Sequence, residues 1–553
     1  MKKGLYCRDH ASVNMRRSRY ALASPFATIL LFGLGIGTAQ ADTVRLKNGQ
    51  LMTGKVIRET PRQVIVDMGM GNKVTFSRED IGSINYEKSS TPSVGVVPAQ
   101  SIPQSNQSES TAENIRQMLE KLLADLSSIM AQSQGALGMG LPGAGGTPPS
   151  ADELIAMADE ILPQVARLRD LAPKGSIAKR VADQETICGL VRQELTKEYP
   201  PEKLANRGKA LIALGLLPSG SDFQALLLEL YTKQVAGMYI PSEKALYLAD
   251  WLPTMMQKGT VAHELVHVLQ DQYFDLDKFL QAVSGNSEAE ATREAIVEGE
   301  AFTVQLEYEF SRVGGGSSNG LAGIREMTPL LSQMVQGMLA GGSVPGMDLS
   351  GVPPFLQKHM IFPYLRGMTF IQAVVNDGQW GNMEQVYRKP PQSTEQILHP
   401  EKYLQQRDDP TEVEPVDVRD KLGSSWTRID EDTLGEFGVG VLLQEFMDDG
   451  AANLASEGWD GDRYHLYEEV STGRLLLLWD SVWDSPQDAE EFLKAYRSVI
   501  ERKYSNAREV SGQLDHWQTD AGDIMLRCRG NRVRIIEGSP ADLLPGLLKA
   551  TDQ

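Results

Sequence analysis

Residues 260–270, TVAHELVHVLQ, contain the pattern His-Glu-x-x-His among apolar, helix-forming residues. Side chains four positions apart lie one turn apart on the same face of a helix, so His263 and His267 can bind one metal ion together. Glu264 then lies beside the metal, where its carboxylate can take a proton from a metal-bound water. Imidazole ligands in tetrahedral geometry favour Zn²⁺, which lowers the pKa of a bound water and polarises a carbonyl group. The pattern therefore predicts one zinc ion per chain and hydrolytic chemistry.

A zinc site of this kind needs a third protein ligand. In metzincins, a Gly and a His follow the second His of the motif by three and six residues. Gln270 and Tyr273 occupy those positions here, which excludes that class. The other common arrangement takes a Glu from a following helix.

Residues 287–302, SEAEATREAIVEGEAF, can supply this Glu, because Glu290, Glu294 and Glu298 share one helical face. Carboxylates stacked on one face repel one another unless a cation or a base neutralises them. A solvated acidic face is the alternative interpretation. The apolar residues 295–297 weaken it, because they indicate burial.

Together, the two segments resemble the gluzincin-type zinc metallopeptidases. Glu298 begins the string Glu-Gly-Glu-Ala, which is similar to the E-G-x-A segment of aminopeptidase-like members, where the Glu is the third ligand. The resemblance implies the following assignment: zinc bound by His263, His267 and Glu298, with Glu264 as the base.

A competing resemblance involves the preceding turn. Residues 293–298, REAIVE, are similar to the thermolysin-like N-E-A-x-x-D, which would make Glu294 the ligand and Glu298 its neighbour in the outer layer. Of these two acids, Glu298 is the preferred third ligand. If neither binds the metal, the next candidates for the third ligand are Glu290, Glu300 and His399.

Longer strings extend the resemblance. Residues 263–276 (HELVHVLQDQYFDL) and 390–403 (PPQSTEQILHPEKY) are similar to a little-characterised group of secreted bacterial zincin-like proteins, over roughly residues 180–410 with a weaker match at 458–464. The spacing between His267 and Glu298 exceeds that of the better-known families, so an extra loop or helix is expected between them. No signature for binding a free amino terminus is present, so both endopeptidase and exopeptidase action stay open.

The segment before the motif could bind substrate. Residues 238–250, MYIPSEKALYLAD, alternate two leucines with Tyr247, as an edge strand would. Zincins commonly bind an extended peptide against such a strand by β-addition, and an ordinary core strand is the alternative. Tyr239, Tyr247 and His399 are candidate donors to a developing oxyanion, although a turn cap is the preferred interpretation of His399.

The N-terminal residues indicate export. Residues 16–41 consist of a basic start, an apolar run and the ending Ala-Gln-Ala, which is the layout of a secretory signal peptide. Residues 1–41 are therefore assigned to the signal peptide, with cleavage before Asp42 and a periplasmic or extracellular bacterial location. No later apolar run is long enough to cross a bilayer, so no integral membrane segment is expected after cleavage. Cys188 and Cys528 can form a disulfide or stay as free thiols.

The patterns along the whole chain predict a multidomain α+β protein. Residues 42–87 alternate apolar positions with turn signals and are expected to form a small SH3-like or Sm-like β-barrel, which binds an envelope partner or is a plain structural module. Residues 88–150 are a linker with one amphipathic helix at 113–130. Residues 151–410 form the mostly helical zincin-like catalytic domain, and residues 411–553 form a C-terminal α+β domain.

Within the C-terminal domain, apolar patterning predicts strands at 463–468, 475–483 and 524–536. Helices are expected after Ser485-Pro486 and Ser539-Pro540, because Ser can cap a helix and Pro suits its first turn.

Composition narrows the class of partner. The chain has 73 acidic against 54 basic residues, a net charge of -19, and this field repels phosphate backbones, so nucleic acid is excluded as a partner. The predicted function is a secreted zinc-dependent metallopeptidase that acts on peptide or protein substrates through a metal-bound water activated by Glu264. The alternative is a catalytically degenerate zincin-like envelope scaffold, which would have no use for the intact Glu264.

Overall fold

The computed structural model describes residues 149–551, apart from 235, 253, 314–322, 326–327, 329–351, 376–378 and 514, together with five strands between residues 42 and 85. The predicted signal peptide and the predicted helix at 113–130 lie outside the described residues. The chain divides into two compact units. The first contains Pro148–Tyr308 and Val352–Gln553, and the five strands belong to the second.

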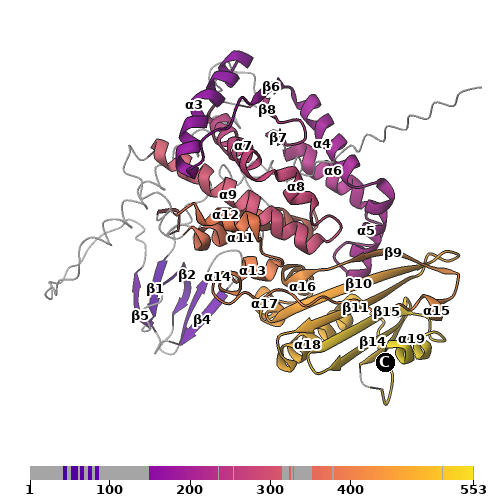
Figure 1. The fold of residues 1–553 in the computed structure, drawn as a ribbon. Coiled ribbons are helices and arrows are strands. Elements are labelled where there is room, and N and C mark those ends of the chain that lie inside the picture. The colour runs from indigo at the N-terminus through magenta and orange to yellow at the C-terminus, as the bar shows by residue number, and fades with distance from the viewer. Residues whose placement is uncertain are drawn as a thin grey trace, which may run out of the picture. The chain divides into compact units, whose positions relative to one another are not determined.

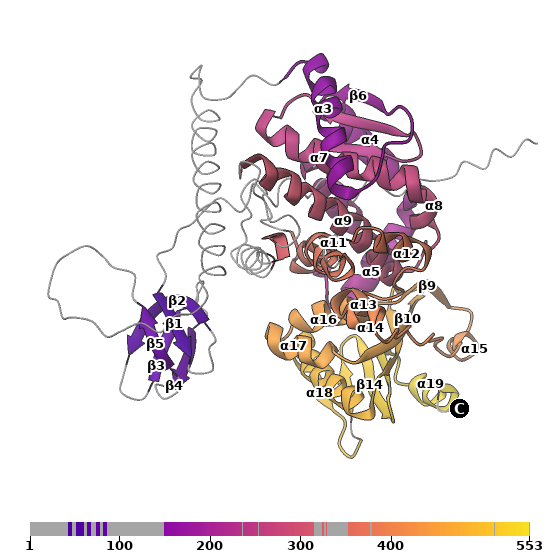
Figure 2. The same ribbon diagram turned by 60° about the vertical axis from the view of Figure 1, so that its left-hand side comes forward.

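The five N-terminal strands, which are labelled in Figure 2, form an antiparallel sheet. Its strand order is β4-β3-β2-β1-β5. They are β1 (Asp42–Leu46), β2 (Leu51–Glu59), β3 (Gln63–Asp67), β4 (Lys73–Ser77) and β5 (Ile81–Asn85). Three of the four pairings join consecutive strands, and the pairing of β1 with β5 brings the two ends of the segment together.

Helices dominate residues 151–410, as the apolar periodicity predicts (Figure 1). They are α3 (Ala151–Arg169), α4 (Gln184–Glu198), α5 (Pro201–Leu214), α6 (Phe223–Gln234), α7 (Thr254–Phe274), α8 (Leu276–Gln281), α9 (Ser287–Val313), α11 (Pro354–Val374), α12 (Asn382–Arg388), α13 (Thr394–Leu398) and α14 (Glu401–Leu404). The short helix α8 lies between the two motif-bearing helices α7 and α9, so the extra element that the long spacing predicts is confirmed.

A three-stranded sheet lies among these helices, in the order β6-β8-β7. Strand β8 (Ala245–Ala249) pairs in parallel with β6 (Ala178–Ala182) and antiparallel with β7 (Gly237–Ile240). Of the two interpretations of residues 238–250, the core strand is confirmed for residues 245–249, because β8 is the central strand and all five of its residues are buried. Residues 238–240 lie in β7, at the edge of the sheet. Strand β6, the parallel partner of β8, lies more than sixty residues earlier and is partly exposed, so local alternation in the sequence does not reveal the pairing.

The C-terminal region is a seven-stranded antiparallel sheet in the order β12-β13-β14-β15-β11-β10-β9. The strands are β9 (Trp426–Asp432), β10 (Trp459–Glu469), β11 (Leu475–Trp483), β12 (Arg508–Glu509), β13 (His516–Thr519), β14 (Gly522–Arg529) and β15 (Arg532–Ser539). Strands at 463–468 and 475–483 are confirmed. The single strand predicted at 524–536 is instead a hairpin, because Gly530 turns the chain with a left-handed φ of 61°.

Helices cover both faces of this sheet. On one face, Trp479 and Trp483 of β11 pack against Phe492 of α18 (Pro486–Lys503). On the other face, the alternate β11 residues Leu476 and Leu478 pack with α15 (Arg419–Leu422) and α19 (Leu544–Thr551). Ser485 caps α18 by accepting from the backbone of its first turn, as expected for Ser-Pro. Helices α16 (Gly435–Gln444) and α17 (Asp449–Ser456) lie between β9 and β10 in the sequence.

Charged contacts fix the C-terminal sheet to the helical region within the first unit. Arg207 of α5 forms an ion pair with Asp432 at the end of β9. The same carboxylate accepts a hydrogen bond of 2.9 Å from the backbone N–H of Ser287, the first residue of α9. Lys503 of α18 donates to the backbone carbonyl of Ala213 at the end of α5. The start of α9 is thus held by the C-terminal sheet.

Among the described residues, no helix is both long and apolar enough to cross a membrane. Cys188 and Cys528 are both free thiols.

Candidate metal centre

Helix α7 presents the two histidines of the motif on one face, and helix α9 brings Glu298 to them. The Nε2 atoms of His263 and His267 lie 2.9 Å apart. Glu298 lies 3.1 Å from His263 Nε2 through Oε2 and 3.6 Å from His267 Nε2 through Oε1. All three side chains are at most 1% exposed, and their donor atoms lie within 4.8 Å of one another, a spacing that could hold a metal ion.

The donor set fits zinc. Gln270 donates from Nε2 to the carbonyl of Val297 at 3.0 Å, which turns its Oε1 toward His267 Nδ1 at 2.8 Å. Nδ1 therefore carries the hydrogen, and Nε2 presents its lone pair to the cluster. Burial lowers the pKa of His267 to about 4, so the ring is neutral at neutral pH, as a metal ligand must be. Two imidazoles and a carboxylate are a common ligand set for catalytic zinc.

One buried oxygen atom of the cluster also lacks a donor. Glu298 Oε1 has no hydrogen-bond partner among the described residues, although the side chain is fully buried. A buried carboxylate oxygen without a donor is costly, and a cation placed between it and the two imidazoles would remove that cost.

Glu264 lies next to the ligand cluster on the same turn of α7. Its Oε2 accepts a hydrogen bond of 2.8 Å from the backbone N–H of Tyr239 in β7, and its side chain is 1% exposed. Burial raises its pKa well above the usual value for a carboxyl group, and the charge of Glu298 adds to this shift, while the Tyr239 N–H opposes it. Glu264 is therefore a carboxyl group with an increased affinity for a proton, beside the atoms that could hold a metal.

The two other acids on the same face of α9 lie outside this cluster. Glu294, one turn before Glu298, lines a neighbouring cavity. Glu290, two turns before it, accepts hydrogen bonds from the Tyr199 hydroxyl at 3.2 Å and the Gly285 N–H at 2.7 Å. The structure thus brings only Glu298 of the three stacked acids to the histidines.

A hydrogen-bonded network extends from His267 to the first helix of the unit. Gln270, which accepts from His267, is also hydrogen-bonded to the Tyr387 hydroxyl. Tyr387 donates to Glu300 at 2.8 Å, and Glu300 forms a buried ion pair with Arg169 of α3. Glu300 therefore lies in the outer layer of the site rather than among the ligand atoms. Sequence patterns did not indicate roles for Gln270, Tyr387 or Arg169, because their partners come from separate helices.

The donors predicted for an oxyanion have other partners. The Tyr239 hydroxyl donates to Asp271 at 2.6 Å, the Tyr247 hydroxyl donates to Glu243 at 2.7 Å, and His399 Nε2 lies 2.9 Å from Glu436.

Tyr364 of α11, which sequence reasoning missed, is placed differently. Its hydroxyl donates to Glu298, and its ring centroid lies 6.2 Å from that of His263. Helix α11 is mostly apolar and carries no motif that would have indicated this role.

A glycine pair brings Tyr364 to the ligands. A Cβ on Gly299 of α9 would lie 2.6 Å from the Cα of Gly367 in α11, so the two helix backbones are in direct contact. Gly299 follows Glu298 directly, and Tyr364 lies about one turn before Gly367. The glycine of the Glu-Gly-Glu-Ala string therefore has a packing role: it allows α11 to approach closely enough for its tyrosine to reach the site.

Fold and site together define a mixed α+β protein with a buried His-His-Glu group that could hold a metal. Residues 423–547 match the model of a family described as a domain of unknown function (DUF8575). This range covers the C-terminal sheet and leaves out the metal centre. No curated protein and no solved structure matches the chain.

Proposed function

We propose that the protein is a zinc-dependent metallopeptidase, in which His263, His267 and Glu298 hold the metal and Glu264 is the general base. The observation that supports this most strongly is the convergence of three buried donor atoms beside a buried Glu with a raised proton affinity. A helix that merely carried two histidines at a surface would bury neither the rings nor a third acid.

The chain's own groups have distinct roles in this proposal. Bound zinc would supply a Lewis acid and lower the pKa of water at the site. Glu264 takes the proton of the attacking water and passes it to the leaving amine, and its raised pKa suits a group that must hold a proton transiently near neutral pH. Tyr364 donates its hydroxyl to Glu298 and so orients this ligand toward the two imidazoles.

We also propose export and an accessory N-terminal module. The leader-like residues 1–41 support cleavage before Asp42 and a location in the periplasm or outside a bacterial cell. The antiparallel order of the five following strands supports a small SH3-like or Sm-like barrel, which could bind an envelope partner or have a structural role.

The test is Glu264→Gln in the full chain, with hydrolysis of casein and of a peptide library as the readout. The substitution keeps the size of the side chain and removes the proton acceptor, so turnover should fall at least about a hundredfold while zinc content stays unchanged. Glu384→Gln is the matched control, because Glu384 is exposed on α12 and forms an ion pair with Arg388 at the surface.

The outcomes separate the alternatives. Wild-type turnover in Glu264→Gln would refute the proposed mechanism. A wild-type protein that binds zinc tightly but hydrolyses no peptide would favour the non-catalytic scaffold.

A further inference from the structure

Tyr239 of β7 binds two acids of α7, one through its backbone and one through its side chain. The backbone N–H donates to Glu264 Oε2 at 2.8 Å, and the hydroxyl donates to Asp271 Oδ2 at 2.6 Å. Glu264 and Asp271 are seven residues apart, which is about two helical turns, so both lie on the face of α7 that meets β7. One buried tyrosine therefore connects the proposed general base to an acid about 10 Å further along the helix.

Asp271 is itself held by partners from three segments of the chain. Its fully buried carboxylate accepts from the Tyr239 hydroxyl, from Lys244 Nζ at 2.7 and 2.9 Å, and from the backbone N–H of Leu276 at 3.1 Å. Lys244 is the last residue before β8, and Leu276 is the first residue of α8. The carboxylate thus binds the β7–β8 hairpin at two points, and a buried polar group with this many partners holds one orientation.

Strand β7 needs such an anchor, because little else fixes it along α7. It has four residues and lies at the edge of the three-stranded sheet, so within that sheet it pairs with β8 alone. It passes close to the base: a Cβ on Gly237 would lie 3.2 Å from Thr260 Cγ2 and 4.0 Å from Glu264 Cγ. A shift of β7 along α7 would carry the Tyr239 N–H away from the Glu264 carboxylate.

We infer that Asp271 is a positioning residue for the general base. Through the Tyr239 hydroxyl it fixes β7 against α7, and the Tyr239 N–H then holds the Glu264 carboxylate in one orientation beside the metal ligands. This inference rests on the proposed peptidase function and adds a third acid of α7 to the site. The hydrogen-bond partners of Asp271 among the described residues include none of the three ligands, so its role concerns the base rather than the metal.

Tyr239→Phe tests the inference in the full chain, because it removes the hydroxyl and keeps both the ring and the backbone N–H. A displacement of about 1 Å in a catalytic group can cost a hundredfold in rate. We expect kcat for fluorescein-labelled casein to fall at least about tenfold, with KM and zinc content unchanged. An unchanged kcat would overturn the inference.

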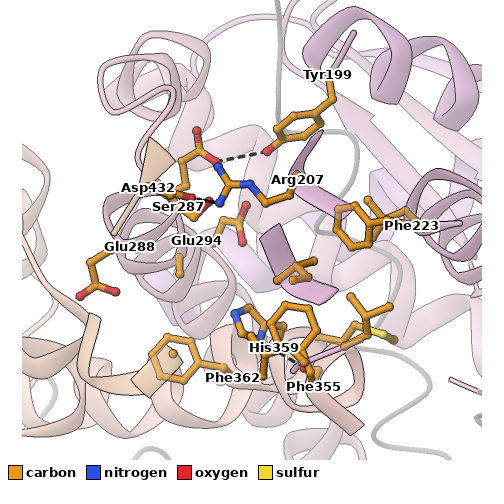
Figure 3. Close-up of a pocket in the computed structure, with 18 of the residues that line it drawn as sticks. Tyr199, Arg207, Phe223, Ser287, Glu288, Glu294, Phe355, His359, Phe362 and Asp432 are labelled. Atoms are coloured by element: carbon orange, nitrogen blue, oxygen red, sulfur yellow. Dashed lines mark hydrogen bonds and ion pairs between the residues drawn. The ribbon is translucent and has the colours of Figure 1, made fainter. Parts of the chain in front are cut away.

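The matched control is Tyr199→Phe, which removes another tyrosine hydroxyl that donates to a carboxylate. Tyr199 donates to Glu290 at 3.2 Å on the wall of a cavity of about 240 Å³ between α5, α6, α9 and α11 (Figure 3). None of the four proposed site residues lines this cavity, and neither do Tyr239 and Asp271. Tyr199→Phe should therefore keep the wild-type kcat.

A double-mutant cycle separates positioning from a general loss of structure. If Tyr239 acts through Glu264, Tyr239→Phe should lower the residual kcat of Glu264→Gln by less than about twofold, because the base is already absent. The same loss in both backgrounds would show that the two residues act independently, and it would overturn the inference.

The conservative variant of Asp271 gives a second comparison. Asp271→Asn keeps an oxygen that accepts from the Tyr239 hydroxyl, so kcat should stay within about threefold of the wild-type value. Asp271→Leu removes the acceptor and should lower kcat at least about tenfold. Equal kcat values in these two variants would contradict a role through the Tyr239 hydroxyl.

Hydrogen exchange tests the same contact without catalysis. Exchange of the residue 239 amide, resolved by fragmentation in a mass spectrometer, reports how often this N–H leaves Glu264. It should be at least about tenfold faster in Tyr239→Phe and unchanged in Tyr199→Phe. If the wild type hydrolyses nothing, the proposed function fails, and the exchange rate alone decides whether Asp271 positions the Glu264 carboxylate: faster exchange supports this role, and an unchanged rate overturns it.

Discussion

Glu294 and Glu298 lie one helical turn apart on α9, yet only Glu298 shares a site with the two histidines. The sequence predicts that the two acids share a face, because they are four residues apart. It cannot say which turn of that face meets α7, since this depends on the length of the intervening α8 and the crossing of the helices. The sequence alone therefore leaves two similar motif resemblances open.

Gln270 offers a test at the residue scale. Gln270→Leu removes the acceptor that keeps the hydrogen on His267 Nδ1. The ring can then carry its hydrogen on Nε2 instead, where no lone pair would be free to bind the metal. Loss of such an outer contact typically costs about 10- to 100-fold in metal affinity, and we expect this range for zinc, measured by competition with a chelator.

Gln270→Glu retains an acceptor and should restore most of the affinity. Gln272→Leu is the control, because Gln272 accepts a hydrogen bond of 2.7 Å from the backbone N–H of Lys174 and has no hydrogen bond to His267 or Gln270 within the described part of the chain. Wild-type zinc affinity in Gln270→Leu would contradict the assigned orientation of His267.

The residues that the sequence revealed and those it missed differ in one physical respect. His263, Glu264 and His267 lie in one helical turn, so their spacing alone determines that they act together. Tyr364 and Gln270 owe their roles to partners from other helices. No local pattern marks such residues, because a tyrosine in an apolar helix is usually a core residue.

At the scale of elements, the contact of α9 with α11 is the most demanding feature of the site. Gly299 and Gly367 bring the two backbones together, and this approach places Tyr364 against Glu298. A side chain at either glycine would separate the helices and move the tyrosine away from the ligands.

Gly367→Ala tests this contact. The added Cβ would lie 2.9 Å from the carbonyl carbon of Ala295, too close to a backbone that cannot give way. Overpacking of this kind costs about 1–3 kcal/mol, so the free energy of unfolding in urea should fall by at least that amount. Gly381→Ala is the control, because nothing lies within 4 Å of its added Cβ. Equal stability of the two variants would contradict the account of the helix contact.

The predictions for individual elements succeeded where local signals were sufficient. The helix that begins after Ser485-Pro486 is confirmed, because its cap and first-turn proline are neighbours in sequence. The sequence could not decide between an edge strand and a core strand for residues 245–249, because the pairing that makes β8 central joins it to β6 across more than sixty residues. The single strand predicted at 524–536 failed because apolar residues run through the turn at Gly530 and conceal the hairpin.

At the scale of the whole first unit, a buried ion pair and a hydrogen bond connect the C-terminal sheet to the helical region that carries the proposed metal centre. Asp432 is 1% exposed on its side chain, pairs with Arg207 and accepts from the start of α9. The family match covers this sheet and begins after the helical region. Arg207 and Asp432 are 225 residues apart in the sequence, so no local pattern predicts the junction.

Asp432→Ala should be strongly destabilising, because it leaves a largely buried Arg207 with Asp430 as its one remaining carboxylate partner among the described residues. Breaking a buried pair costs about 3–5 kcal/mol, measurable as a lower free energy of unfolding in urea. Arg419→Ala is the control, since its pair with Asp417 is more than half exposed and should contribute little. Similar losses in the two variants would contradict the view that the junction stabilises the unit.

The most direct test of the central claim is the zinc content of the purified full chain after dialysis. The wild type should retain one zinc ion per chain, because two buried imidazoles and a buried carboxylate converge on one point. Glu298→Ala should emerge free of metal, and Glu294→Ala should keep its zinc, since Glu294 lines the cavity instead. A wild type without zinc, or full zinc content in Glu298→Ala, would contradict the proposed metal centre.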